Sequence, residues 1–222
     1  MTRGDRKRGR AVPYVAAALA LAACSRRSPP PPAARPATEA ERPPPLQPAA
    51  AFTAIDDRAA RSRALYAEAA RVITHPRCTS CHPADGVPRQ GLDQRPHEPR
   101  VVAGPDGHGP PGLPCASCHQ ESNTTLTGAT LASVPGNPKW ALAPVSMAWL
   151  GLSPGAICEQ LKDPARNGGK SLEAIWHHMA HDELVGWGWA PGPGRQPVPG
   201  TQQAFGELIR AWIDTGAVCP SP

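Results

Sequence analysis

Apolar residues recur at helical spacing in four segments of this chain, and each segment predicts a helix. The first segment covers residues 56–73, with its apolar side chains on one face. Each of the other three follows a serine or threonine that can cap a helix, namely Ser153, Ser171 or Thr201. The last segment ends at Gly216. Strand-like alternation of any length is missing from the sequence, so the pattern predicts a mainly α fold.

Proline and glycine dominate the chain between the first two predicted helices, above all in residues 83–112. These residues interrupt helices and indicate loops. The whole chain has 30 prolines and 21 glycines but only 5% aromatic residues. A core of side chains alone would therefore be thin, and large apolar cofactors would supply the missing bulk. We expect a small helical domain with long, ordered, Pro/Gly-rich loops.

The N-terminus has the features of an export signal. Basic residues come first, and a short apolar stretch follows at residues 12–20. That stretch is too short to span a bilayer, so we predict a signal peptide over residues 1–23. The sequence Leu21-Ala22-Ala23-Cys24 resembles a bacterial lipobox, which implies cleavage before Cys24 and acylation of that cysteine. The alternative is an ordinary signal peptide that includes Cys24. Ser25 in the next position favours the outer membrane over the inner membrane.

Residues 24–51 consist largely of proline and alanine and have little to bury. We expect them to form a disordered, partly polyproline II tether between the membrane and the domain. The functional domain is then predicted over residues 52–222. Residues 1–23 carry +4 of the chain's formal charge of +5, so the mature chain is nearly neutral. Nucleic-acid binding is therefore not indicated.

Two pentapeptides carry the strongest chemical signal: Cys78-Thr79-Ser80-Cys81-His82 and Cys115-Ala116-Ser117-Cys118-His119. This CxxCH spacing is the attachment signal of c-type haem. Two thiols three residues apart can add to the two vinyl groups of one porphyrin, and the next histidine can bind the iron as proximal ligand. We therefore expect two covalently bound haem c groups, with His82 and His119 as proximal ligands. The alternative is a four-cysteine zinc ribbon, which would not need a histidine after each pair.

The chain has seven cysteines, of which Cys158 and Cys219 are left after lipidation and haem attachment. In the oxidising periplasm two remaining thiols are expected to pair. We predict a disulfide between them that holds the C-terminus. Two free thiols are the alternative.

Each haem iron also needs a sixth ligand from a histidine or methionine elsewhere, unless its site is open. His97 lies in the loop between the two motifs, where a neighbouring proline could hold its imidazole over an iron. Met179 lies at the centre of the apolar stripe on the predicted helix after Ser171, and His178 lies at its edge. Met147 is a further candidate. Core packing for the methionines and a surface position for the histidines are the alternatives.

His177 and His181 lie on the opposite face of the same predicted helix, where we expect them to face water. A pair of histidines at this spacing can hold zinc, but the glutamate of an HExxH motif is missing.

The region from the first CxxCH to the C-terminus resembles a family of small dihaem proteins known as isoquinoline 1-oxidoreductase subunits. These proteins are encoded beside periplasmic molybdenum hydroxylases of the xanthine dehydrogenase type. The resemblance implies haem at both motifs and a molybdenum hydroxylase as partner. The stretches that carry it are the second haem motif, Pro96-His97, 140–149, 161–169, His178-Met179, 185–192 and 199–202.

We therefore expect an electron-transfer protein rather than an enzyme. As a lipid-anchored dihaem cytochrome c in the periplasm, it would accept electrons from the molybdenum hydroxylase and pass them to the respiratory chain. A dihaem peroxidase with one open iron site is the first alternative. A zinc-binding interaction module is the second.

The lipobox hypothesis predicts the outcome of one substitution. Replacing Cys24 by serine should block processing or release the protein from the membrane fraction, because the acylated thiol is lost. Fractionation and an immunoblot measure this result. Normal processing with continued membrane association would contradict a lipid anchor at Cys24.

Overall fold

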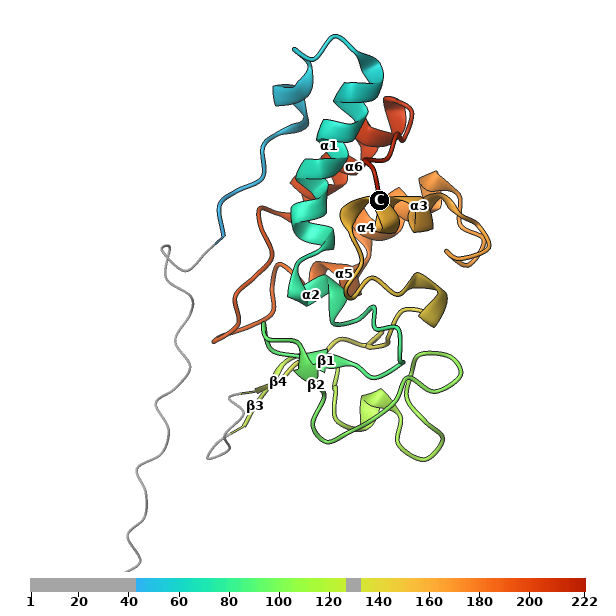
Figure 1. The fold of residues 1–222 in the computed structure, drawn as a ribbon. Coiled ribbons are helices and arrows are strands. Elements are labelled where there is room, and N and C mark those ends of the chain that lie inside the picture. The colour runs from blue at the N-terminus through green and yellow to red at the C-terminus, as the bar shows by residue number, and fades with distance from the viewer. Residues whose placement is uncertain (1–42, 127–132) are drawn as a thin grey trace, which may run out of the picture. The chain divides into compact units, whose positions relative to one another are not determined.

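Figure 1 shows the computed structural model, which describes residues 43–126 and 133–222. The predicted signal peptide, Cys24 and most of the predicted tether lie outside these residues. The described part is mainly helical, as predicted. Its helices are α1 (Arg58–Ile73), α2 (Pro76–Thr79), α3 (Pro154–Lys162), α4 (Leu172–His181), α5 (Glu183–Gly186) and α6 (Gln202–Asp214), with short 3-10 helices η2 (Ala49–Phe52), η3 (Cys115–Ser117) and η4 (Val145–Met147).

Each of the four longer helices begins at a side chain that caps its first turn. Asp57 accepts a hydrogen bond from the backbone of Ala60 at the start of α1. Ser153, Ser171 and Thr201 accept equivalent bonds of 3.1, 3.2 and 3.1 Å from the backbone nitrogen three residues later. The helices predicted from these caps are therefore confirmed.

The helical core forms where α6 packs against both α1 and α4 (Figure 1). Tyr66 of α1 contacts Trp212 of α6, with ring centres 5.2 Å apart. Ser62 is fully buried between the same helices; it donates to the carbonyl of Trp212 and accepts from the backbone of Val218. The apolar stripe predicted for α6 is buried throughout and consists of Phe205, Leu208, Ile209 and Trp212.

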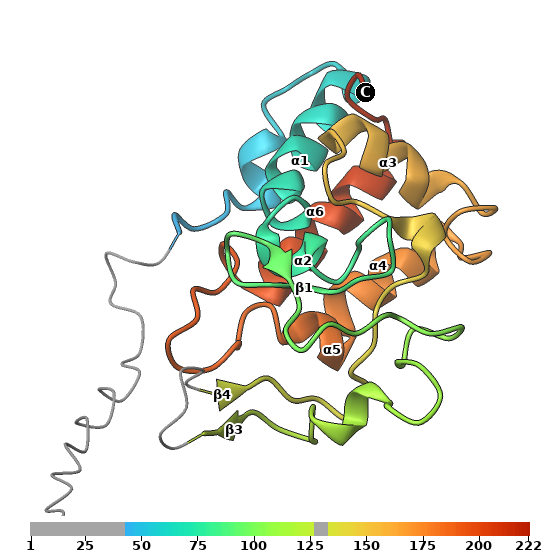
Figure 2. The same ribbon diagram turned by 60° about the horizontal axis from the view of Figure 1, so that its bottom comes forward.

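The segments 80–126 and 133–150 contain little regular structure and lie together on one side of the helices (Figure 2). Their strands are two residues long and form two antiparallel pairs. The strands are β1 (Arg89–Gln90), β2 (Arg95–Pro96), β3 (Thr124–Thr125) and β4 (Ser133–Val134). Both CxxCH motifs begin on this side, the first in α2 and the second in η3.

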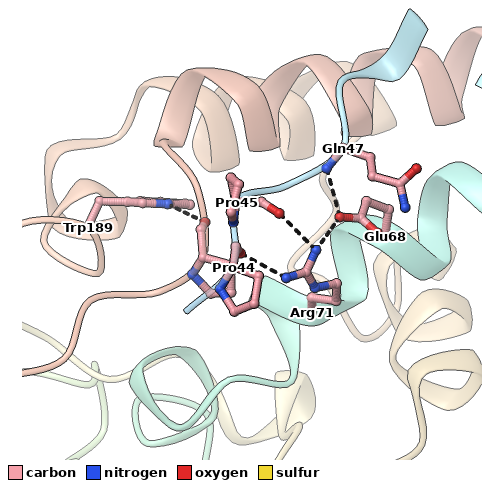
Figure 3. Close-up of polar contacts among 7 residues, drawn as sticks. Pro44, Pro45, Gln47, Glu68, Arg71 and Trp189 are labelled. Atoms are coloured by element: carbon pink, nitrogen blue, oxygen red, sulfur yellow. Dashed lines mark hydrogen bonds and ion pairs between the residues drawn. The ribbon is translucent and has the colours of Figure 1, made fainter. Parts of the chain in front are cut away.

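The domain makes contacts before residue 52, where we had predicted its start. Figure 3 shows Arg71 of α1 donating to the carbonyls of Pro44 and Pro45, at 2.8 and 3.1 Å. Glu68 accepts from the backbone of Gln47 and forms an ion pair with Arg71. Leu46 is only 9% exposed and belongs to the core. Residues 43–51 are thus part of the packed domain, because α1 supplies partners for backbone groups that the Pro/Ala composition had suggested were solvated.

Cys158 of α3 and Cys219 near the C-terminus form a disulfide across a sequence separation of 61 residues. Cys158 is fully buried, so the bond fixes the C-terminal segment to the core. This is the pairing that the cysteine count predicted. Closing a loop of this length stabilises the folded state by about 4 kcal/mol in the chain-entropy description.

Replacing Cys158 and Cys219 together by alanine should lower the free energy of unfolding by about 4 kcal/mol, because the unfolded chain regains the entropy of an open loop. Denaturant titration of the purified protein measures the change. Peptide mapping without reductant should recover the two cysteines as one cross-linked pair. Recovery of either as a free thiol would contradict the disulfide.

Candidate haem sites

The first CxxCH motif lies on α2 and the turn that follows it. The side chain of His75 caps this short helix by accepting from the backbone of Arg77 at 3.1 Å. The next turn places Cys81 N 3.1 Å from the carbonyl of Cys78. Both thiols are free, and burial raises their pKa values to about 12 for Cys78 and about 11 for Cys81. They are therefore neutral thiols on one face of a single turn, a suitable arrangement for attachment to one ligand.

His82 is fixed by two contacts. Its Nδ1 lies 2.7 Å from the carbonyl oxygen of Met147. A carbonyl can only accept, so Nδ1 carries the proton and Nε2 keeps a lone pair for a metal ion. The imidazole also stacks on Trp149, with ring centres 3.5 Å apart and planes within 3° of parallel. Burial lowers the pKa of His82 to about 4, so the ring is neutral at pH 7.

His119 of the second motif has the same two kinds of contact. Its Nδ1 lies 2.7 Å from the carbonyl oxygen of Pro135, so Nε2 is again the nitrogen available to a metal. Its ring stacks on Trp140, with centres 4.5 Å apart and planes within 9° of parallel. Burial lowers the pKa of His119 as well. Two motifs 37 positions apart in the sequence thus have equivalent surroundings.

One segment, residues 133–149, supplies all four of these contacts. It also binds the motif backbone, since the backbone nitrogens of Ala143 and Trp149 donate to the carbonyls of Cys81 and His82 at 3.0 and 2.8 Å. Sequence reasoning missed this role. Trp140 and Trp149 lie in a stretch that carried the family resemblance, but a backbone carbonyl has no sequence signature.

Asn123 anchors this segment beside the second motif. Its Oδ1 accepts from the backbone of Gly136 at 2.9 Å and from the indole of Trp187 at 3.1 Å. A Cβ on Gly136 would overlap the carbonyl of Ser122, so only glycine fits after Pro135. Trp187 in turn meets Trp140 edge to face, at 5.1 Å between ring centres. The position of Pro135, and hence of His119, therefore depends on contacts that extend through Asn123 to Trp187, the residue that follows α5.

His97, one of the predicted ligand candidates, lies beside the histidine of the second motif. It follows β2, and its backbone nitrogen donates to the carbonyl of Pro88 at 2.9 Å. Its Nδ1 donates to the carbonyl of Pro99, 2.8 Å away, so Nε2 is the ring nitrogen left to bind a metal ion. The ring centres of His97 and His119 are 5.9 Å apart. At this separation both imidazoles could bind one metal ion, since an imidazole nitrogen ligand lies about 2 Å from its metal.

The β1–β2 hairpin holds His97 by its connection to the first motif. The backbone of Arg89 donates to the carbonyl of Ser80 at 3.2 Å, and Gln94 donates to the hydroxyl of Thr79. The hairpin is thus attached to one CxxCH motif while it carries a histidine to the other. This places the two sites close to each other.

The other three candidates lie nearer the first motif or in the core. His178 of α4 interacts electrostatically with His82, and its Nδ1 lies 3.5 Å from Asp182 Oδ2. Met179 is only 4% exposed and packs in the helical core. Met147 is also buried, and its carbonyl binds the Nδ1 side of His82, away from Nε2.

His177 and His181 are exposed, as predicted, with ring centres 5.1 Å apart. Among residues 43–126 and 133–222, no three His, Cys, Asp or Glu side chains gather into a metal-binding group. The four motif cysteines therefore do not converge as the ligands of a zinc ribbon would.

Comparison of the chain with known proteins gives no match to a family model, to a curated protein or to a solved structure.

Proposed function

We propose that this chain is a dihaem c-type cytochrome that transfers electrons. The observation that carries this proposal is the equivalence of the two CxxCH motifs. In each, the histidine donates from Nδ1 to a backbone carbonyl 2.7 Å away and stacks on a tryptophan. A bound imidazole needs this second contact to fix its tautomer and orientation. A chance CxxCH sequence has no reason to acquire it twice.

The residues present fit haem c at both positions. Cys78 and Cys81 would hold one haem, and Cys115 and Cys118 the other, through thioether bonds. His82 and His119 would be the proximal ligands. When bound, the haem supplies the one-electron chemistry. The protein's own residues hold the imidazoles, exclude water from them and set the surrounding charge.

We assign His97 as the sixth ligand at the second site, because its ring lies 5.9 Å from that of His119 and its Nε2 is available. At the first site we assign His178, since it interacts with His82 and has a carboxylate at Nδ1. Met179 and Met147 rank below it because both are packed in the core. Sequence analysis alone favours His97 and Met179 over Met147 and His178, so the assignment of His178 changes that order at the first site.

Two histidines on each iron would leave no open position for a substrate. Electron transfer is therefore favoured over the alternative of a dihaem peroxidase. The family resemblance supports a molybdenum hydroxylase as electron donor and a respiratory acceptor downstream. The disulfide agrees with a periplasmic location. Among the described residues, no helix is both long and apolar enough to cross a membrane.

The purified protein should contain two covalent haems per chain, measured as the pyridine haemochrome after acid–acetone extraction. Replacing Cys115 and Cys118 together by alanine should halve this value, because only the first motif then attaches haem. An unchanged value would contradict attachment at the second motif, and the absence of haem from the native protein would contradict the proposed function.

Replacing His97 by alanine should convert one of the two haems from low spin to high spin, because the iron at the second site loses its sixth ligand. Visible and electron paramagnetic resonance spectra measure this change. His108 to alanine is the matched control, since His108 is an exposed histidine of the same inter-motif loop. A fully low-spin spectrum for the His97 variant would contradict the assignment. A methionine–iron charge-transfer band in the native protein would contradict His178 at the first site.

A further inference from the structure

Arg77 is a partly buried cation that pairs with no carboxylate of residues 43–126 or 133–222. It directly precedes Cys78, and its Nε donates to the carbonyl of Gln196 at 2.9 Å. Its guanidinium group lies over Trp187, 5.9 Å from the ring centre. Among the residues that the structure describes, no Asp or Glu forms an ion pair with it. Neither Nη1 nor Nη2 of Arg77 has a hydrogen-bond acceptor among the described residues.

Arg195 is held by three hydrogen bonds to neutral oxygens of the described residues. Its Nη1 donates to Ser133 Oγ at 2.6 Å and to the carbonyl of Pro191 at 3.3 Å, while Nη2 donates to the carbonyl of Ser133 at 2.6 Å. No described carboxylate pairs with this guanidinium either. A cavity of about 490 Å³ lies beside Arg195, lined also by Trp189 and Pro197. An anion therefore has room to approach.

The two arginines interact unfavourably with each other. Burial lowers the pKa of both, and repulsion from Arg195 lowers the pKa of Arg77 further. By contrast, four other arginines of the described residues each pair with a carboxylate: Arg71, Arg89, Arg95 and Arg210. Two like charges are costly at a partly buried position unless an anion compensates them.

Each arginine lies near one CxxCH motif. Arg77 directly precedes Cys78 of the first motif. Arg195 donates to the carbonyl of Ser133, two residues before Pro135, whose carbonyl accepts from His119 of the second motif. Trp187 connects the same region, since it lies under Arg77 and contacts Trp140, which stacks on His119. An anion at this position would thus be close to both sites.

We propose that Arg77 and Arg195 form a carboxylate-binding site for the propionate groups of the haem attached at Cys115 and Cys118. This inference rests on the proposed function. A haem carries two propionates, which match two guanidinium groups in charge, and an arginine fork binds a carboxylate through two hydrogen bonds. The propionates lie on the porphyrin edge opposite the thioether bonds. Arg77 adjoins Cys78 and is therefore at the thioether edge of the first haem, which leaves the propionates of the second haem as its partners.

The test compares Arg77→Gln, Arg195→Gln and the double variant with the native holoprotein by spectroelectrochemical titration at several pH values. Each substitution should lower the midpoint potential of one haem, because a positive charge that disfavours ferric iron is lost. The propionate also loses its partner, so its pKa rises. The potential of the variants should then rise as the pH falls through that pKa, while the native potential stays constant over the same range.

Arg210→Gln is the matched control, since Arg210 also lies over a tryptophan, Trp176, at 3.9 Å, but already pairs with Glu173. It should leave both potentials and their pH dependence unchanged. If the glutamine variants do not incorporate haem, Arg77→Lys and Arg195→Lys test the proposed carboxylate site, because they keep the positive charge. They should retain most of the native potential.

Two further arms identify the source of the carboxylates. In the Cys115→Ala, Cys118→Ala background, the arginine substitutions should no longer make the remaining potential depend on pH, because the propionates that they bind are gone; a pH dependence that persists would overturn the assignment to the second haem. Acetate added to the native protein at constant ionic strength should leave the potentials unchanged, and a dependence on acetate would show that the site binds a free anion instead. Two haems per chain with potentials unaffected by the arginine variants would overturn this inference alone, whereas a chain without haem would overturn the proposed function.

Discussion

Two hydrogen bonds join residues 133–149 to the two CxxCH motifs. They run from His82 to the carbonyl of Met147 and from His119 to the carbonyl of Pro135. Residues 133–149 have almost no regular structure of their own, so their position depends on such contacts. Each bond also decides which imidazole nitrogen carries the proton. The same interaction therefore holds the loops together and leaves Nε2 of each histidine as the nitrogen without this bond. The stacked tryptophans then restrict rotation of the two rings.

Packing among the helices holds these loops in place. The contacts of α6 with α1 and α4 bury the large apolar residues, and the disulfide fixes the C-terminal segment against α3. The chain from α5 to α6 then returns to the loop side, where Trp187, Pro191 and Arg195 contact Asn123 and Ser133. Packing of the helices thus determines where the second motif lies relative to the first.

The histidines and the arginines near the two motifs differ in their charge state. Both motif histidines are partly buried and kept neutral by desolvation, which suits a ligand that must offer a lone pair. Arg77 and Arg195, in contrast, keep their charge without a carboxylate among the described residues. A protein that binds anionic cofactors has a physical reason to retain such cations, because the cofactor completes the ion pairs.

The local features of this protein can be predicted from its amino-acid sequence. Capping residues and apolar stripes located α1, α3, α4 and α6, because both signals depend on neighbours within a few positions. For the same reason, the CxxCH spacing indicated the haem-attachment residues that we propose, and the cysteine count paired Cys158 with Cys219. The Pro/Ala composition of residues 43–51 predicted a disordered tether. This prediction was wrong because Glu68 and Arg71 of α1 bind the backbone of these residues, and composition does not reveal such partners. Only the tertiary structure decided which candidates approach a motif histidine, since His97 meets His119 through a hairpin anchored on the other motif. It also brought Arg77 and Arg195 together from positions 118 residues apart, a juxtaposition that depends on long-range packing and leaves no periodic or spacing signal in the chain.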